Sequence, residues 1–329
     1  MNIKKPYFFA FFSLILSACG GNKHPYPDKF VILTEHIPLD DAALNTVLYN
    51  TNYYTLKADY KFVCFTNKLE ADSEITRKIS QQEFHFTSVR KDTLLAGTYN
   101  FDLSTDNYYL DKDFSWKFLS KGPVNQTMYE DETYEVSSCC NGEFGGSIFF
   151  KEKRTGKIYS CPATCPTSVN KMNGIYYLSI SLSHLHGHSS ILQIADPKQL
   201  KEIHSTSTAL CTWWDTCVTY KDSFKGMDSL MRGTIPLYKG RKSTIVLSFV
   251  YNNQLYHLNS KNDITYISRL ICDTLQPVDT LANYSIRFGH GNYSSKTPTY
   301  QGVTSIYDLD QNGFIEQRHD TIFIRLFTN

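Results

Sequence analysis

The sequence lacks several features that would define a class of protein by themselves. Its longest apolar stretch after the N-terminus, residues 243–251, is far shorter than the ~20 residues that a membrane-spanning helix needs. Its 33 Lys and Arg are balanced by 32 Asp and Glu, so no basic stripe marks a nucleic-acid surface and we expect no nucleic-acid partner. GxSxG, HExxH, GxGxxG and CxxC motifs do not occur, so we expect no cofactor and find no catalytic signature.

Glycine and tryptophan are also scarce. The 329 residues include 17 Gly and 3 Trp, but 23 Tyr and 21 Phe. Tyrosine and phenylalanine favour the pleated, half-buried surface of a β-sheet. The composition therefore indicates a β-rich chain, long enough for one large β domain or two smaller ones.

Residues 1–19 have the pattern of an export signal. Lys4 and Lys5 precede an apolar run at 7–16, which as a helix would rise only about 15 Å. The sequence Leu-Ser-Ala-Cys at 16–19 then resembles the lipobox of bacterial lipoproteins. The resemblance implies that residues 1–18 are a lipoprotein signal peptide and that Cys19 becomes the lipidated N-terminal residue. An ordinary cleaved signal, or an N-terminal strand with an unmodified cysteine, is the alternative.

This interpretation divides the chain into a signal peptide (1–18), a lipidated cysteine with a flexible tether (19–29) and a β-rich domain (30–329). The tether carries two glycines and two prolines without apolar periodicity. The expected partner is a membrane, reached through the lipid on Cys19, because each buried methylene contributes about 0.8 kcal/mol and several acyl chains hold a protein firmly. Gly20, where an aspartate would favour retention in the inner membrane, favours the outer membrane of the cell envelope.

Eight cysteines remain if Cys19 is lipidated, an even number in a compartment where disulfides form. We expect Cys211 and Cys217 to pair, because a turn between them brings their Cα atoms within bonding reach. A zinc site is the alternative for a second cluster of cysteines. Two of these cysteines are adjacent in sequence, unlike the spaced pairs of structural zinc sites, so disulfides are favoured. The clustered residues are Cys139, Cys140, Cys161 and Cys165.

Hairpin patterns recur at intervals of about 60 to 70 residues. Their turns are expected at 154–157, in the longer loop of 173–197, at Asn252-Asn253 and at Asn312-Gly313. With two earlier units, this spacing predicts a β-propeller of about five blades; a β-sandwich or two β domains is the alternative. The body also resembles uncharacterised envelope lipoproteins with propeller-like β domains, in phrases such as NGIYYL (173–178) and ILQIADP (191–197). That resemblance supplies no catalytic motif.

Three short helical segments are expected between strands: one after Asp40-Asp41 with Leu44 and Leu48, one capped by Asp72 or Ser73, and one opened by Asp196-Pro197. The final strand, residues 321–327, is apolar on both faces. Propellers often close by placing a terminal strand in the opposite terminal blade, and we expect this strand to do so.

Three histidines, His184, His186 and His188, alternate along SHLHGHSS. On a strand, alternate residues face one side, so these imidazoles would converge on a metal ion or line a ligand loop. Gly187 and the flanking serines favour a hairpin loop, in which the alternation is lost. Loop histidines are therefore the preferred interpretation.

Two further segments have a chemical and a structural interpretation. Trp213 and Trp214 would stack on a ligand ring if exposed, or pack a blade if buried, and burial is favoured. Asp308, Asp310 and Asn312 occupy the first positions of a calcium-like loop, but its twelfth position holds His319 where a glutamate belongs. A hairpin is favoured over a calcium site, and no metal site is assigned.

Two functions fit these observations. The first is a binding or scaffolding lipoprotein of the cell envelope that uses loops at one end of a β body for a protein or glycan ligand. The alternative is a glycan-directed hydrolase with carboxylates supplied by different blades, whose pairing a single sequence does not reveal. A pocket lined by convergent acids would favour the hydrolase, and an acid-free centre would favour the binding module.

The lipobox predicts that membrane attachment depends on one sulfur atom. Mass spectrometry of the N-terminal peptide should show an acylated Cys19 as the first residue, and Cys19→Ser should move the protein into the soluble fraction. A Cys19→Ser chain that stays in the membrane pellet after an alkaline wash would contradict the prediction.

Overall fold

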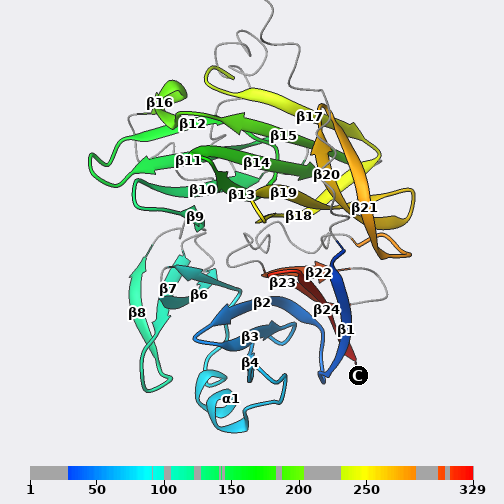
Figure 1. The fold of residues 1–329 in the computed structure, drawn as a ribbon. Coiled ribbons are helices and arrows are strands. Elements are labelled where there is room, and N and C mark those ends of the chain that lie inside the picture. Colours follow the sequence, from blue (N-terminus) through cyan, green and yellow to red (C-terminus); the bar gives the residue numbers. More distant parts are fainter. Residues whose placement is uncertain are drawn as a thin grey trace, which may run out of the picture.

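β-Strands make up nearly all of the regular structure in the computed structural model, which describes residues 29–90, 92–99, 105–121, 127–140, 142, 145–182, 187–203, 231–286, 303–307 and 312–328. The described strands form six small sheets arranged in a ring, so the fold is a β-propeller (Figure 1). The prediction of a propeller is confirmed, with six blades where about five were expected. No helix among the described residues is long and apolar enough to cross a membrane.

Each blade is a sheet of antiparallel neighbours that follow one another in sequence, apart from the additions at the ends of blades 3, 4 and 6. Blade 1 contains β2 (Ala43–Tyr49), β3 (Asn52–Lys57) and β4 (Phe62–Phe65). Blade 2 contains β5 (Phe86–Arg90), β6 (Thr93–Tyr99), β7 (Thr105–Leu110) and β8 (Trp116–Lys121). Blade 3 contains β9 (Thr127–Glu130), β10 (Tyr134–Cys140), β11 (Gly146–Glu152), β12 (Ile158–Pro162) and β16 (Lys201–Ile203).

The second half of the ring has the same plan. Blade 4 contains β13 (Pro166–Met172), β14 (Ile175–Leu182), β15 (His188–Ile194) and β17 (Ile235–Arg241). Blade 5 contains β18 (Ser243–Tyr251), β19 (Gln254–Lys261), β20 (Ile264–Ile271) and β21 (Thr274–Ala282). Blade 6 contains β22 (Val303–Tyr307), β23 (Asn312–Arg318), β24 (Thr321–Thr328) and β1 (Val31–Pro38).

Unequal spacing explains why the sequence pattern underestimates the number of blades. The first strands of blades 1 to 4 begin at residues 43, 86, 127 and 166, but those of blades 5 and 6 begin at 243 and 303. The last two intervals, 77 and 60 residues, lie near the expected period of about 60 to 70, whereas the first three are 43, 41 and 39 residues. In the first half the blades follow one another more closely than that period allows.

Two of the three expected helical segments are confirmed. Asp72 caps α1 (Ser73–Ile79) by accepting a hydrogen bond from the backbone N–H of Ile75 at 2.9 Å. Asp196 caps the short 3₁₀ helix η2 (Pro197–Gln199) in the same way.

The helix expected around Leu44 and Leu48 is wrong, because this segment is strand β2. Residues four apart share a face of a strand as well as of a helix, so their spacing does not separate the two. The β-branched Thr46 and Val47 between them favour the strand, and β3 supplies its pairing partner.

The hairpin turns at 154–157 and at Asn252-Asn253 are confirmed; both asparagines adopt the positive φ that a tight hairpin turn requires, 47° and 56°. The turn expected at Asn312-Gly313 is wrong, since both residues begin β23 and pair with β22 and β24. Gly313 instead allows β23 and β24 to approach closely, because a Cβ at this position would lie 2.0 Å from the carbonyl oxygen of Arg325. The chain turns after β23 at His319, whose φ is 54°.

Both ends of the described chain meet in blade 6. β1 pairs in parallel with β24 over its full length, from Val31 opposite Thr321 to Pro38 opposite Thr328 (Figure 1, blue beside red). The terminal blade is therefore shared, as expected, but the exchange runs in the other direction. The N-terminal strand joins the C-terminal blade, while the C-terminal strand stays in its own.

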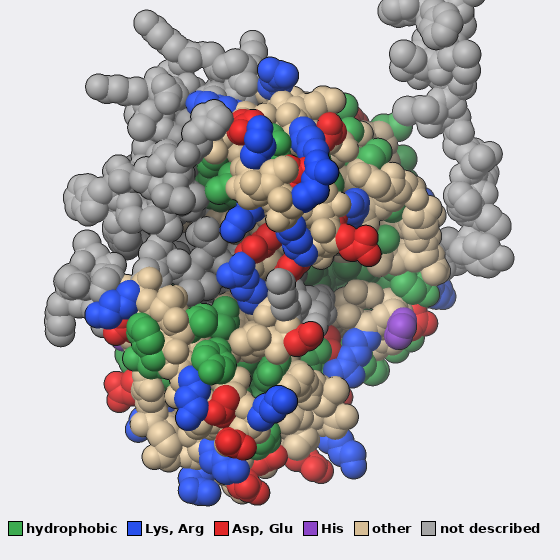
Figure 2. Space-filling model, turned by 90° about the vertical axis from the view of Figure 1, so that its left-hand side faces the viewer, with side chains coloured by type: hydrophobic (Ala, Val, Ile, Leu, Met, Phe, Trp, Pro, Cys, Tyr) green, Lys and Arg blue, Asp and Glu red, His purple; other side chains and the backbone are tan. Residues whose placement is uncertain are grey.

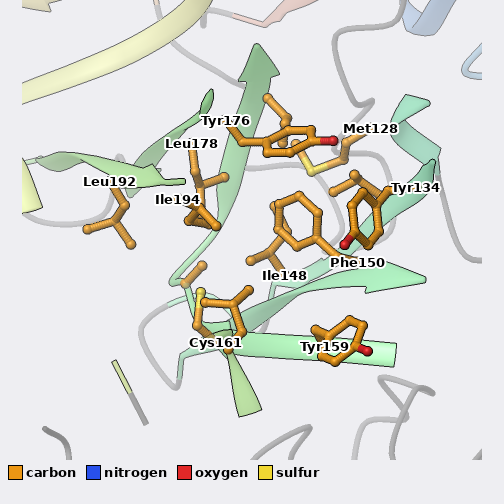
Figure 3. Close-up of a cluster of buried hydrophobic side chains, with 14 of the residues drawn as sticks. Met128, Tyr134, Ile148, Phe150, Tyr159, Cys161, Tyr176, Leu178, Leu192 and Ile194 are labelled. Carbon is orange, nitrogen blue, oxygen red and sulfur yellow. The ribbon is translucent and has the colours of Figure 1, made fainter. Parts of the chain in front are cut away.

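Apolar clusters fill the spaces between neighbouring blades. Blades 1 and 2, 3 and 4, 5 and 6, and 6 and 1 each share one. In the cluster of blades 3 and 4, the rings of Tyr134, Phe150 and Tyr176 contact one another edge to face, with centroids 5.3 to 6.0 Å apart (Figure 3). Aromatic side chains thus pack between the sheets, as the tyrosine- and phenylalanine-rich composition suggested.

The junction that closes the ring also holds buried charge. The Tyr53 hydroxyl of blade 1 donates a hydrogen bond to Glu316 of blade 6 at 2.6 Å. Arg325 forms an ion pair with Glu316, donates to the same hydroxyl, and donates through Nε to Glu35 of β1 at 2.8 Å. Burial and the neighbouring Glu316 raise the pKa of Tyr53 to about 12, so its hydroxyl stays protonated and able to donate.

Loss of the buried carboxylate should weaken the closed ring. Glu316→Gln removes the buried counter-ion of Arg325 and leaves only the partly exposed Glu35 as its carboxylate partner. We expect a loss of about 3 kcal/mol or more in the free energy of unfolding, measured by urea denaturation. The control is Glu202→Gln, which removes an exposed ion pair with Lys157 and should cost about 1 kcal/mol or less. Equal losses for the two variants would contradict the role given to Glu316.

Candidate functional site

Short polar side chains characterise the first strands of blades 1 to 5, for which side chains are described. First strands contact one another around the ring, β2 with β5 and β22, and β13 with β9 and β18. Their buried polar residues are Asn45, Thr46, Thr87, Ser88, Thr127, Thr167, Ser168, Ser243, Thr244 and Ser248. Within the described residues these strands bury hydroxyl and amide groups, where a hydrolase would need a converging pair of carboxylates.

The buried carboxylates of the described residues are held by cations. Glu316 is paired with Arg325 in the ring closure, and Glu152 is paired with Lys198 at 2.8 Å. A general acid needs a carboxyl whose pKa is raised towards neutrality. The pKa of Glu152 is instead lowered, first by the hydrogen bond from Lys198 and then by that from Thr155.

Asp131 forms a second ionic group, at the junction of blades 3 and 4. Its Oδ2 accepts hydrogen bonds from Lys171 Nζ at 2.7 Å and from the Tyr176 hydroxyl at 2.6 Å, and Lys171 also donates to that hydroxyl at 2.9 Å. Burial raises the pKa of Asp131, but the hydrogen bonds from Lys171, Tyr176 and two backbone N–H groups outweigh it and lower the pKa to about 2. Asp131 is therefore an anion that fastens two blades, and is unsuited to act as a general base near neutral pH.

A serine–histidine pair lies between blades 4 and 5. Ser248 Oγ is 2.7 Å from His257 Nδ1 and 2.7 Å from Ser179 Oγ. Such a pair would activate a nucleophile if a substrate reached it. All three side chains are buried, and burial lowers the pKa of His257 to about 3, so the ring is uncharged. The group joins β14 to β18 and β19 and serves the packing of the ring.

Among the three sequence-predicted histidines, His188 lies on β15, opposite Arg241 on β17. Burial lowers its pKa, and the nearby Lys239 and Arg241 lower it further. These cations create a setting that disfavours a bound metal ion. His184 and His186 lie outside the described residues.

The clustered cysteines contain a disulfide between Cys140 and Cys165, which links the end of β10 to the start of β13. The zinc alternative is therefore wrong for these two residues, because their sulfur atoms bond to each other. Cys161 is buried in the cluster of blades 3 and 4, and burial raises the pKa of its thiol to about 12. The described part of the chain contains no group of three or more metal-ligating side chains.

The remaining sequence-predicted residues are not tested by the structure. Asn312 is described and starts β23. The following lie outside the described residues: Cys19, Cys211, Cys217, Trp213, Trp214, Asp308 and Asp310.

One exposed group of aromatic rings was missed by the sequence reasoning. Tyr60, from the turn between β3 and β4, lies 4.9 Å from His85, and His85 lies 5.6 Å from Tyr99 at the end of β6 (ring centroids). Tyr60 and Tyr99 keep 38% and 43% of their surface exposed. We call these three residues the aromatic platform. The residues are far apart in a tyrosine-rich sequence, and no periodicity distinguishes them from rings of the core.

Figure 2 shows the side of the molecule where β8 lies in Figure 1. On its lower part, hydrophobic side chains reach the surface between scattered charges of both signs. Phe118 and Leu119 of β8 are among the exposed large hydrophobic residues of this blade, together with Tyr99. Blade 2 thus carries three of the nine exposed large hydrophobic residues of the described chain.

No family model and no curated protein matches the chain. Three solved structures show the extent of its likeness to known folds. The computationally designed protein Ika8 has a TM-score of 0.38, 10% identity and 89% coverage of each chain. A mutant apocarotenoid oxygenase of Synechocystis has a TM-score of 0.38 and 9% identity, with 82% of this chain and 67% of that chain covered. PorZ, a surface component of the type-IX secretion system of Porphyromonas gingivalis, has a TM-score of 0.31 and 9% identity, with 82% and 46% covered.

The lowered pKa of Asp131 makes its contribution depend on pH. A folded-state pKa of about 2, below the ordinary value of 3.8, stabilises the fold above pH ~4, and this stabilisation is lost as the pH falls towards 2. Asp131→Asn should therefore be less stable than the wild type at pH 6, with a difference that shrinks between pH 4 and pH 2 in urea titrations. Asp113→Asn, on the surface, is the control. A difference that stays constant across this range would contradict the assignment.

Proposed function

We propose that this protein is a lipid-anchored binding module of the cell envelope. The lipobox at residues 16–19 supports the anchor, and the tether at 19–29 connects it to the propeller. The proposal places the protein on the outer membrane, held by the acyl chains on Cys19.

The binding role is supported by a contrast between the acidic and the aromatic side chains of the described residues. The buried acids Glu152 and Glu316, and the partly buried Asp131, each form an ion pair with a lysine or arginine of the same chain. The aromatic platform, in contrast, is held at the surface. Carboxylates that are engaged in ion pairs are not available for hydrolysis, whereas exposed aromatic rings can contact a ligand. This arrangement favours ligand binding over hydrolysis.

The test uses the Cys19→Ser chain, so that lipid insertion does not contribute, and delipidated envelopes of the native host. We expect the labelled chain to co-sediment with the envelopes in a saturable way, and excess unlabelled chain to reduce its bound fraction about tenfold. We also expect no release of reducing sugar from the envelope glycans. Binding that does not saturate would contradict the binding role. An accumulation of reducing ends would replace it with the hydrolase alternative.

A further inference from the structure

We propose that the aromatic platform of Tyr60, His85 and Tyr99 is a binding site for an uncharged oligosaccharide. The inference rests on the proposed binding function and adds the chemical class of the ligand. Two features of the platform carry it: both of its tyrosine rings are exposed, and hydrogen bonds fix the platform in place. The charge beside the rings then decides against an anionic ligand.

Tyr60 is held in place by backbone contacts. Its backbone N–H donates to the carbonyl of Lys57 at 2.9 Å, and its own carbonyl accepts from the N–H of the buried Phe84 at 2.8 Å. These bonds tie the turn of blade 1 to the start of blade 2. The φ of Tyr60 is 65°, a left-handed conformation that is unfavourable for an aromatic residue and would suit Gly or Asn better. The turn thus bears strain at the residue that exposes its ring.

His85 and Tyr99 are fixed to each other. The backbone N–H of Tyr99 donates to His85 Nδ1 at 2.9 Å. Since Nδ1 accepts this bond, the ring hydrogen resides on Nε2, which is left as a donor. The ring of Phe86 lies beneath Tyr99 with a centroid distance of 5.3 Å, and it occupies the space next to Gly97, where a Cβ would come within 2.2 Å of it. Gly97 therefore makes room for the ring that supports Tyr99.

These groups match the chemistry of a sugar. A pyranose ring has a face of C–H groups that packs on aromatic rings and a rim of hydroxyls that forms hydrogen bonds. The platform supplies two exposed tyrosine rings with their hydroxyls, and the Nε2–H of His85. Its ring planes are inclined by 63° and 32°, so they form an angled surface that suits puckered sugar rings better than a flat aromatic ligand.

We take the ligand to be uncharged because the charged group beside the platform would repel an anionic glycan. In the turn that carries Tyr60, Lys57 pairs with Asp59 at 3.2 Å and with Asp40 at 3.1 Å. One cation against two carboxylates leaves this group with a net negative charge, which disfavours an anionic glycan.

The test is calorimetric titration of the full mature chain, in a detergent without a sugar headgroup, with cellohexaose, maltohexaose, xylohexaose and N-acetylchitohexaose. We expect saturable binding of at least one of these. Tyr60→Asn, which removes the ring and suits the left-handed turn, and Tyr99→Ala should each weaken that binding about tenfold or more. Phe118→Ala, which removes a ring that is even more exposed (55%) from the edge strand β8, is the control and should bind as the wild type does.

Three results would overturn the inference: no binding of any neutral hexasaccharide, unchanged affinity in Tyr60→Asn and Tyr99→Ala, or tighter binding of hexagalacturonate than of every neutral probe. Thermal unfolding of each variant establishes that the fold is intact. Co-sedimentation of the same two variants with delipidated envelopes separates this inference from the proposed function. If they still bind envelopes, the binding module stands and the platform is not its site.

Discussion

Closure of the ring is the constraint on which the rest of this structure depends. A propeller whose first and last blades do not meet would expose the apolar faces of both. Here the junction is made by the parallel pairing of β1 with β24 and by the buried guanidinium of Arg325, which binds Glu316, Glu35 and the Tyr53 hydroxyl. These partners come from β1, blade 1 and blade 6. One cation therefore joins segments from both ends of the described chain, and removal of Glu316 would take away the buried anion that balances it.

The other junctions use different chemistry for the same purpose. Blades 3 and 4 share a disulfide and the Asp131 ion group, whereas blades 4 and 5 share the hydroxyl and imidazole groups around Ser248. Arg90 of blade 2 pairs with Glu135 of blade 3 at 2.5 Å. Groups that would suggest catalysis in isolation are thus explained by their positions between blades, and this leaves the surface rings as the candidates for recognition.

The sequence predicts much of this fold because local signals are strong where they exist. Asp72 and Asp196 cap their helices as expected, and the Asn252-Asn253 turn has the positive φ angles that its residues favour. Errors arise where one pattern fits two structures. The spacing of Leu44 and Leu48 suits helix and strand alike, and Gly313 resembles a turn residue although it makes space for the backbone of Arg325.

The candidate site could not be predicted in the same way. The pairing of Asp131 with Lys171, or of Tyr60 with His85, joins residues that are neighbours only once two blades pack together. Nothing local in the sequence distinguishes a tyrosine that stays exposed from one that is buried, because that outcome depends on what the next blade covers.

The parallel pairing of β1 with β24 affects the order in which the molecule folds. Among the described strands, β1 is the first to be synthesised, and its pairing partner β24 is the last. Until β24 has been synthesised, β1 therefore has no native edge to pair with, and its Ile37, which is buried in the folded chain, stays uncovered. Contacts so distant in sequence form slowly, since a very long loop has to close first. The interval is also when β1 of one chain is free to pair with β24 of another, so domain-swapped dimers are the misassembly that this topology invites.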